Sequence, residues 1–586
     1  MSTTLTRLAR AAAGALLCAA ALPATAVAAP SPEAPAPGDA APAADPAYQV
    51  LAFSKTAGYR HGSIDEGLTA LRELGAAHDF TVDATEDAAA FDSANLAQYE
   101  AVVFLSTTGD VLNAAQQEAF EGYIRDGGGY VGVHAAADTE YDWPFYGGLA
   151  GAYFASHPHI QPATVVVEDR AHPATAHLGE GWQRTDEWYN YRSNPRERAR
   201  VLASLDESSY EGGTMGGDHP IAWCQEYEGG RSFYTGGGHT EASFADPAFR
   251  QHLLGGIRWA AGAAQADCRP ETGYTPLFDG TGLDGWTQAG PGSFTLEDGT
   301  LTSQGGMGLL WYEQQEFSSY SLKLDWRMAG DDNSGVFVGF PASDDPWSAV
   351  DNGYEIQIDA TDAPERTTGA VYGFQSADLA ARDAALNPPG EWNTYEIRVE
   401  GERLRLWLNG TLINDFTNTD PVRSLADGYI GLQNHGDSDE VSFRDIRIKE
   451  LGSGPDPGPV SGPITGIGGK CVDVAGGDAS DGTQVQLWSC NGSAAQEWSL
   501  PGDGTVRALG KCLDVSGGGT ADGTKVQVWS CNGTGAQVWE AHADGSLVNP
   551  QSGKCLDAEG VSSADGTRLH LWSCHGGENQ RWVLPG

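Results

Sequence analysis

Positive charge is scarce in this chain: 34 lysine and arginine residues stand against 79 aspartate and glutamate residues, which gives a formal net charge of −45. A surface this acidic repels polyanions, so we expect neither nucleic acid nor an anionic membrane as a partner. Long apolar runs are also missing beyond the N-terminus, and no later stretch of about 18 apolar residues predicts a membrane span. These absences favour a protein that handles neutral ligands.

The N-terminus has the pattern of a secretory signal peptide. Arg7 and Arg10 precede an apolar stretch at 11–22 that is too short to cross a bilayer, and Ala-Val-Ala at 26–28 offers a cleavage site. Residues 1–28 are therefore predicted to be removed, and the protein to be secreted. Residues 29–47, rich in Ala, Pro and Asp, are predicted to form a disordered linker.

Cysteine usage agrees with export. Of nine cysteines, Cys18 lies in the predicted signal peptide, which leaves an even number and favours disulfides. Cys224 and Cys268 are predicted to pair with each other, with two buried free thiols as the alternative. The other six form three pairs, each separated by 19 positions: Cys471 with Cys490, Cys512 with Cys531, and Cys555 with Cys574.

Residues 464–586 repeat one phrase three times. Each copy contains Lys-Cys, Asp-Gly-Thr, Trp-Ser-Cys and Gln-x-Trp in the same order. A unit this short cannot bury a core alone, so the three units are expected to share one. Short strands with Asp-Gly turns predict all-β structure, and the triplication predicts a pseudo-threefold β-trefoil with one disulfide per unit.

This segment resembles the ricin-B-type lectin family over its full length. The resemblance implies a polysaccharide or oligosaccharide partner and one shallow sugar site per repeat, where an Asp binds hydroxyls and a Trp stacks on the sugar face. Ala495 and Ala536 depart from the Asn found at 579, and His570 replaces a Gln. The Trp residues of Gln-x-Trp are predicted to be core. The implied sugar-binding residues are Asp473, Gln486, Trp488, Gln496, Asp514, Gln527, Trp529, Gln537, Asp557, His570, Trp572, Asn579 and Gln580.

Residues 274–451, followed by a Pro/Gly/Ser-rich linker at 452–463, contain many alternating segments and few helical periods. This pattern favours two packed antiparallel sheets, a jelly roll. In the segment YEIQID at 354–359, a period of two places Glu355, Gln357 and Asp359 on one face and the isoleucines on the other. Such a face is typical of the floor of a ligand groove, with a solvated sheet face as the alternative.

Phrases along this segment resemble the 3-keto-disaccharide hydrolase (3-keto-glycoside lyase) family. They include LFDG at 277–280, NSGVF at 333–337, GYEIQI at 353–358 and GLQNH at 431–435. The resemblance implies a concanavalin-like jelly roll that cleaves 3-keto-glycosides through proton abstraction, β-elimination and water addition.

Residue roles at this site come from side-chain chemistry and strand facing rather than from the resemblance. Glu355 or His435 is the predicted general base, and Gln357, Asp359 and Gln433 are predicted to hold sugar hydroxyls. Arg327 is a candidate clamp, with a surface ion pair as the alternative. The acidic turn at 331–333 offers oxygen ligands for a cation such as Ca²⁺, with a plain turn as the alternative.

Residues 48–265 alternate buried-strand runs with helical periods, which predicts an α/β domain with a parallel sheet and helices on both faces. His61, His134 and His239 each follow a predicted strand, where such sheets bind ligands. With Glu187 they form a candidate second site. For each histidine alone the alternative is a structural hydrogen bond, and no tight histidine spacing assigns a metal.

The phrases of this segment resemble the trehalose-utilisation (ThuA-like) family, which is related in fold to class I glutamine amidotransferases. The amidotransferase elbow is Gly-x-Cys-x-Gly, whereas residues 132–136 read Gly-Val-His-Ala-Ala. Without the thiol, glutaminase chemistry is excluded at this position. The whole sequence thus predicts a secreted hydrolase or lyase that acts on carbohydrate. The alternative is a non-catalytic protein with several carbohydrate-binding modules.

Overall fold

The computed structural model describes residues 48–451, 460–500, 504–532, 534–542 and 545–585. The predicted signal peptide, the linker after it and most of the linker at 452–463 lie outside these residues. The elements form an α/β sheet, a β-sandwich and a set of short strands, each around its own apolar core. Within the described residues, no helix is both long enough and apolar enough to cross a membrane.

The α/β part is built on a nine-stranded sheet in the order β2-β1-β3-β4-β11-β10-β9-β6-β7. The first five strands of this order are parallel, and the remaining four run antiparallel. The strands are β1 (Tyr48–Phe53), β2 (Phe80–Thr85), β3 (Ala101–Leu105), β4 (Gly129–Val133), β6 (Gln161–Val167), β7 (Gly181–Asp186), β9 (Arg200–Leu205), β10 (Pro220–Tyr227) and β11 (Gly230–Thr235).

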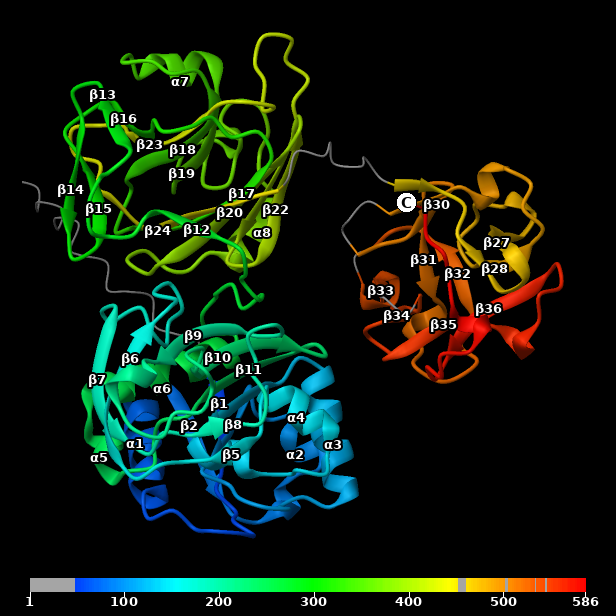
Figure 1. Cartoon of the computed structure of the whole chain (residues 1–586), viewed down its shortest axis with the longest axis horizontal. Helices are drawn as coiled ribbons and strands as arrows, with labels where there is room; N and C mark the ends of the chain where they lie inside the picture. Colours follow the sequence, from blue (N-terminus) through cyan, green and yellow to red (C-terminus); the bar gives the residue numbers. More distant parts are fainter. Residues whose placement is uncertain (1–47, 452–459, 501–503, 533, 543–544, 586) are drawn as a thin grey trace, which may run out of the picture. The chain divides into compact units, whose positions relative to one another are not determined.

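Two groups of helices lie on opposite sides of this sheet (Figure 1). One group contains α1 (Ile64–Ala77), α5 (Glu241–Ala245) and α6 (Pro247–Ala260), which contact one another. The other contains α2 (Ser93–Leu96), α3 (Ala114–Arg125) and α4 (Pro144–Ala150). Outside the main sheet, β5 (Phe154–Ser156) pairs with β8 (Asn190–Tyr191) in a two-stranded antiparallel sheet. The α/β class is confirmed, but the sheet is only half parallel. β10 and β11 are joined by a tight hairpin, and such a connection allows only antiparallel pairing.

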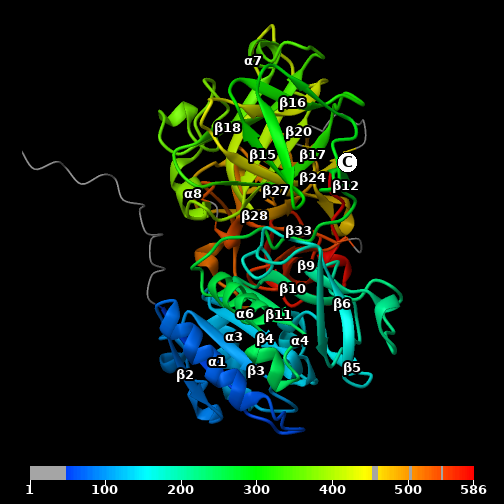
Figure 2. The same ribbon diagram turned by 90° about the vertical axis from the view of Figure 1, so that its left-hand side faces the viewer.

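The second part is a sandwich of two antiparallel sheets, whose strands can be followed in Figure 2. The larger sheet contains β12 (Thr275–Phe278), β14 (Ser293–Glu297), β15 (Thr300–Gln304), β17 (Tyr320–Met328), β20 (Asn393–Glu400), β21 (Arg403–Leu408), β22 (Thr411–Thr417) and β24 (Val441–Glu450). The smaller sheet, in the order β13-β16-β23-β18-β19, contains β13 (Trp286–Ala289), β16 (Gly308–Tyr312), β18 (Asn333–Phe340), β19 (Tyr354–Asp359) and β23 (Tyr429–Asn434). Two short helices, α7 (Trp347–Asn352) and α8 (Leu379–Ala385), accompany them.

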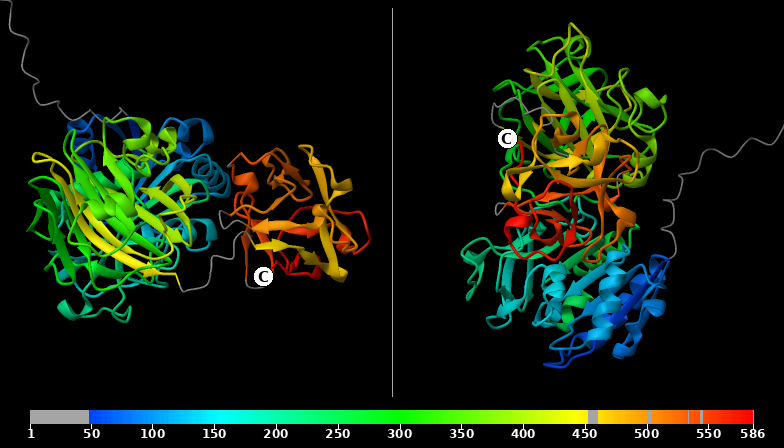
Figure 3. Two further views of the ribbon diagram at one scale, coloured as in Figure 1. Left: turned by 90° about the horizontal axis from the view of Figure 1, so that it is seen from above. Right: turned by 90° about the vertical axis from the view of Figure 1, so that its right-hand side faces the viewer.

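The third part consists of short strands in three similar units, coloured yellow to red in Figure 3. They are β25 (Val460–Gly462), β26 (Thr465–Gly466), β27 (Lys470–Val474), β28 (Thr483–Trp488), β29 (Trp498–Leu500), β30 (Arg507–Ala508), β31 (Lys511–Val515), β32 (Val526–Trp529), β33 (Glu540–Ala541), β34 (Leu547–Asn549), β35 (Lys554–Ala558) and β36 (Thr567–Trp572). The predicted core residues Trp498, Trp539 and Trp582 are buried, and each indole N–H donates to a backbone carbonyl.

Each unit also anchors the next through its Asp-Gly-Thr turn. Asp481 accepts the backbone N–H of Ser530 at 2.7 Å, Asp522 accepts that of Ser573, and Asp565 accepts that of Ser489. The three bonds therefore link each unit to the next around the pseudo-threefold axis, and the units also share one apolar core. The four predicted disulfides are formed, including Cys224–Cys268, which ties β10 to the segment after α6.

Candidate functional site

The smaller sheet of the sandwich carries polar side chains on the face turned away from the core. On β19, Ile356 and Ile358 enter the core between the sheets, so Glu355, Gln357 and Asp359 point the other way. All three are buried, with at most 8% of their surface exposed. The predicted alternation is therefore present, and the solvated-face alternative is not, because a solvated face would leave these side chains exposed.

The neighbouring strands extend this face. Gln433 of β23 lies opposite Leu309 of β16, and Phe337 of β18 lies between Glu355 and Gly431. Leu309, Phe337 and Trp311 belong to a small apolar cluster outside the main core. Polar and apolar groups thus share the face, as they do where proteins bind sugars, whose C–H faces and hydroxyls need both.

Five buried polar atoms on this face have no hydrogen-bond partner among the described residues. They are Glu355 Oε1, Gln357 Oε1, Gln433 Oε1, Asn333 Oδ1 and Trp311 Nε1. Buried polar atoms are rarely left unpaired, because each loses its water without compensation. Burial also raises the pKa of Glu355 to about 8. A carboxyl with such a pKa accepts or gives a proton near neutral pH, as an acid–base catalyst must.

Of the predicted members of this site, Arg327 lies on the other sheet and His435 lies just past the end of a strand of this one. Trp326 of β17 enters the core, so its neighbour Arg327 points outward from the larger sheet and stacks over Trp392, with 4.7 Å from the guanidinium carbon to the ring centre. Arg327 therefore does not lie beside Glu355, which belongs to the smaller sheet. The prediction was wrong because the alternation along a strand does not tell which of the two sheets the strand joins. His435 lies just past the end of β23, about half exposed, and its Nδ1 is 2.8 Å from Asp439 Oδ2.

The acidic turn before β18 is held by its own hydrogen bonds. Asp331 accepts the hydroxyl of Thr361, and Asp332 accepts the backbone N–H groups of Gly330 and Glu440. Over the described ranges, the side-chain groupings close enough to hold a metal ion do not include this turn. These hydrogen bonds are those of a plain turn, and the Ca²⁺ site stays a prediction.

In the α/β part, the four residues of the candidate second site converge. His134 directly follows β4, His61 and His239 follow β1 and β11, and Glu187 follows β7. The first three strands belong to the parallel half of the sheet, so their carboxyl ends lie at one edge. One potential ligand atom from each residue lies within 4.8 Å of the others. The structure therefore brings all four side chains together.

Hydrogen bonds orient this cluster. His134 has a φ of 49°, a left-handed conformation that is uncommon outside glycine, and its Nδ1 is 2.9 Å from the Gly236 carbonyl oxygen. Asp186 accepts the backbone N–H groups of Gly238 and His239, which fixes the loop after β11. Glu187 Oε2 is 3.0 Å from His239 Nδ1, and Glu187 Oε1 is 3.0 Å from His157 Nδ1.

Burial and charge shift the titration of the cluster. Burial, together with the neighbouring His134, lowers the pKa of His61 to about 3. Burial alone would raise the pKa of Glu187, but the neighbouring His134 and His239 lower it below its ordinary value. In return, and against the effect of burial, Glu187 raises the pKa of His239. Glu187 is therefore an anion that faces imidazole nitrogens.

The three repeats of the C-terminal part present the predicted groups alike. In the first, Gln486 and Gln496 donate their amide N–H groups to the two oxygens of Asp473 at 3.0 and 3.1 Å. In the second, Gln527 and Gln537 do the same to Asp514. Trp488, Trp529 and Trp572 are 39–41% exposed, so part of each side chain is open to solvent. Hollows beside the first two repeats are lined by Asp473 with Trp488 and by Asp514 with Trp529.

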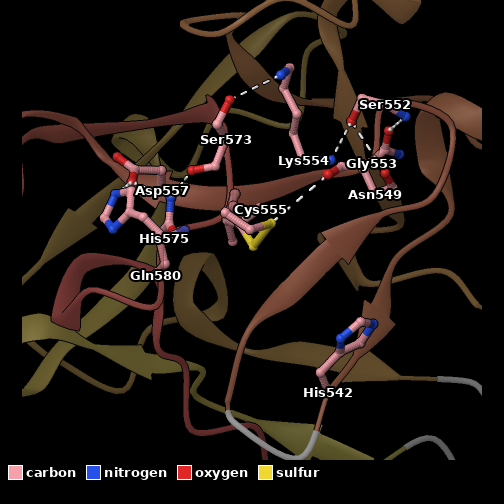
Figure 4. Close-up of a disulfide and its surroundings, with 12 residues drawn as sticks. His542, Asn549, Ser552, Gly553, Lys554, Cys555, Asp557, Ser573, His575 and Gln580 are labelled. Carbon is pink, nitrogen blue, oxygen red and sulfur yellow. Dashed lines mark hydrogen bonds and ion pairs between the residues drawn. A yellow bond between two sulfur atoms is a disulfide. The ribbon is translucent and has the colours of Figure 1, made fainter. Parts of the chain in front are cut away.

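The third repeat differs from the other two, and Figure 4 shows its Asp557 beside His575 and Gln580. His570, Asn579 and Gln580 all lie within hydrogen-bonding distance of Asp557, at 3.0, 2.7 and 2.9 Å, and His575 Nε2 is 3.6 Å away. The Asp557 carboxylate is thus more fully engaged by the protein than its counterparts.

Some residues at these sites were not predicted. Asn491 and Asn532 line the first two hollows, and His575 replaces them in the third repeat. Their signal was present, since all three directly follow the second cysteine of a repeat. Trp311 and His157 carried no such signal, because only tertiary pairing brings them beside Glu355's face and Glu187.

Comparison with known proteins adds three matches in chain order. Family models described as "Trehalose utilisation" (ThuA), "3-keto-alpha-glucoside-1,2-lyase-like domain" and "Ricin-type beta-trefoil lectin domain" match residues 49–260, 273–449 and 460–582. The chain therefore belongs to the class of multidomain, carbohydrate-active proteins. Its three parts are similar, in that order, to the trehalose-utilisation, 3-keto-alpha-glucoside-1,2-lyase-like and ricin-type lectin families.

Individual relatives match parts of the chain. A 3-keto-disaccharide hydrolase of Bacteroides thetaiotaomicron is 24% identical over 233 residues, which cover 30% of this chain and 79% of that protein. A glucan endo-1,3-beta-glucosidase of an Arthrobacter species is 52% identical over 68 residues, but these cover only 12% of its length. The structure of a ThuA-like protein from Bacteroides uniformis is 26% identical, with a TM-score of 0.33, and the match covers 38% of this chain and 94% of that one.

Proposed function

We propose that the protein is a secreted hydrolase or lyase that cleaves 3-keto-glycosides at the outer face of the smaller sandwich sheet and is anchored to polysaccharide by its lectin domain. Five unpaired buried polar atoms around a carboxyl of raised pKa carry this proposal. The name of the Bacteroides relative, a 3-keto-disaccharide hydrolase, supports the same substrate class. The disulfides and the signal-peptide pattern support secretion. The proposed domain limits are 48–265, 274–451 and 464–586.

The chemistry follows from the substrate. A ketone at C3 of a glycoside acidifies the hydrogen on C2, and the Glu355 carboxylate takes that proton. The electron pair passes to the ketone oxygen as an enediolate, which the Trp311 N–H can stabilise by donating a hydrogen bond. The enediolate then collapses and expels the C1 substituent, which leaves with a proton. Water adds back to the resulting double bond and gives the free 3-keto sugar.

The remaining groups would hold the sugar. The unpaired oxygens of Gln357, Gln433 and Asn333 are acceptors, and sugar hydroxyls are the donors that would satisfy them. Phe337 and Leu309 offer apolar surface beside them. His435, paired with Asp439 beyond the end of β23, is proposed as a proton carrier rather than the base, because it is half exposed.

The test is turnover by the full-length protein. We expect release of the aglycone from an aryl 3-keto-glucoside, and a loss of about 10²–10⁴-fold in kcat/KM for Glu355→Gln. Glu297→Gln, which changes an exposed carboxyl of the same part, is the control. If the wild-type protein binds the 3-keto-glucoside without releasing the aglycone, the non-catalytic multi-module binding protein is the better reading.

A further inference from the structure

The cluster formed by His61, His134, His239 and Glu187 has the composition of a metal site. Three imidazoles and one carboxylate are ligands that first-row divalent transition metals, Zn²⁺ above all, share in proteins. The four side chains come from four separate strand ends, so no short sequence motif announces them. The other grouping of this kind among the described residues, His172 with Cys224 and Cys268, is not available because its cysteines form a disulfide.

The distances match metal coordination. Glu187 Oε2 is 3.0 Å from His239 Nδ1 and 3.6 Å from His134 Nε2, and the two histidine nitrogens are 3.2 Å apart. Ligand atoms at about 2.0–2.1 Å from a tetrahedral zinc ion lie roughly 3.4 Å from one another. The observed triangle therefore brackets the spacing that one ion would impose, without any movement of the backbone.

The hydrogen bonds around the cluster leave its lone pairs facing inward. Because the Nδ1 of His134 donates to the Gly236 carbonyl oxygen, its Nε2 is free of a proton when the ring is neutral. Metal-binding histidines are held in this way by a carbonyl or carboxylate on the far nitrogen. Glu187 shows the same division, since Oε1 faces His157 and Oε2 faces the histidine pair.

His61 supplies an independent observation. The residue is 5% exposed, and its Nδ1 has no hydrogen-bond partner among the described residues. The ring stands edge-on to those of His134 and His239, with centres 4.9 and 5.1 Å apart. Burying an imidazole nitrogen without a hydrogen-bond partner costs desolvation free energy, and a bound ligand at this nitrogen would compensate for that cost.

We propose that His134, His239, Glu187 and His61 bind one divalent transition-metal ion of the Zn²⁺ type. The ion lies at the edge where the parallel strands β1, β4 and β11 end, the place where open α/β sheets bind ligands. The side chain of His239 is 20% exposed and that of His157 is 43% exposed, so the edge is open to solvent on their side. The site is separate from the Glu355 face and does not depend on the proposed glycoside chemistry.

The experiment uses the full-length protein stripped of metal by a chelator and then titrated with Zn²⁺ by calorimetry. We expect about one ion per chain and a rise in the melting temperature on binding. Co²⁺, used as a second probe, is expected to give the visible absorption bands of an ion bound by nitrogen and oxygen ligands. Glu187→Gln and His239→Gln are expected to weaken Zn²⁺ binding at least tenfold, at about the scale seen when metal-site partners are removed.

His177→Ala is the matched control, because this histidine belongs to the same domain but bonds to the carbonyl of Ala248. Circular dichroism of the metal-free variants checks that they remain folded. His239 and Glu187 are replaced in preference to His134, because His134 is fully buried and its replacement would disturb the fold more. The proposal is overturned if the wild-type chain takes up no Zn²⁺, or if both variants bind it as tightly as the wild type and the His177→Ala control.

Discussion

Glu355 reaches across Gly335 of the neighbouring strand, so closely that a Cβ atom at position 335 would collide with its carboxyl. The two residues lie on adjacent strands, with Gly335 directly opposite Gln357. The absence of a side chain at 335 therefore creates the space in which the carboxyl lies. Glycine is required at position 335 because the Glu355 carboxyl lies so close to it. Its own backbone does not require glycine, since its φ is one that other residues also adopt.

The first prediction concerns this close approach. Gly335→Val should displace the Glu355 carboxyl and lower kcat/KM for a 3-keto-glucoside by at least about tenfold, because a shift of about 1 Å at a reacting group is costly. Gly330→Ala, in the turn before the same strand, has room for its methyl group and should leave turnover unchanged. Equal activity of both variants would show that the carboxyl position does not matter.

The second prediction is that Glu355 makes stability fall as pH rises. Its pKa is about 8 in the folded protein and 4.5 when unperturbed, so between these values the folded state binds more protons than the unfolded state. The free energy of unfolding should then decrease by up to about 1.4 kcal/mol per pH unit in this window, and level off above it. Scanning calorimetry of the full chain should show a flatter pH dependence for Glu355→Gln, whereas Glu297→Gln should retain the wild-type slope.

The third prediction concerns the pH dependence of turnover. A general base acts in its ionised form, so kcat/KM should rise with pH and level off above the pKa of Glu355, about 8. Initial rates with the aryl 3-keto-glucoside, measured across this range, test it. A rate that falls steadily as pH increases would instead indicate that Glu355 acts as an acid.

The fourth prediction concerns the lectin repeats. Trp488→Ala and Trp529→Ala should each weaken binding to a neutral polysaccharide by about 1 kcal/mol, the size of an aromatic stacking contact. The double variant should lose more than either, because sites on one chain bind cooperatively to a polymer. Trp572→Ala should have the smallest effect, since Asp557 beside it is already engaged by the protein. Affinity electrophoresis measures all four.

His542→Ala is the control for that series, because this half-exposed histidine lies apart from the Asp557 site in the same domain (Figure 4). If the three tryptophan variants and the control migrate alike in every polysaccharide tested, the exposed rings do not bind sugar.

The fifth prediction concerns the disulfide between Cys224 and Cys268. It closes a segment of 44 residues, so replacing both cysteines by Ala should lower the stability of the α/β part by about 3–4 kcal/mol. Thermal unfolding of the full chain should show the change, while polysaccharide binding stays as in the wild type. An unchanged melting profile would mean that packing alone holds the segment after α6.

The lectin repeats were the most predictable part of the molecule. Their triplicated spacing determined which cysteines pair, and it distinguished the buried Trp498 from the exposed Trp488. The alternation at 354–359 likewise predicted that Glu355 and Gln357 share a face. Local periodicity is sufficient in these cases because the neighbours in question are set by the repeat or by the strand itself.

Arg327 shows where periodicity stops. The sequence predicted that Arg327 lies on a strand, but the strand could belong to either of two sheets. Only its pairing with β20 and β24 places it on the larger sheet. The antiparallel half of the first sheet was missed for a similar reason, because strand order depends on hydrogen bonds between segments far apart in the chain.

By itself, the sequence determined the three-part composition, the disulfide spacing and the chemical character of each candidate site, because these follow from local patterns and residue types. The tertiary structure alone decided which polar atoms are buried without partners beside Glu355, and that His61, His134, His239 and Glu187 meet at one strand edge. The distances among the three histidines and Glu187, and the raised pKa of Glu355, depend on packing between segments far apart in the chain. No local sequence pattern encodes that packing.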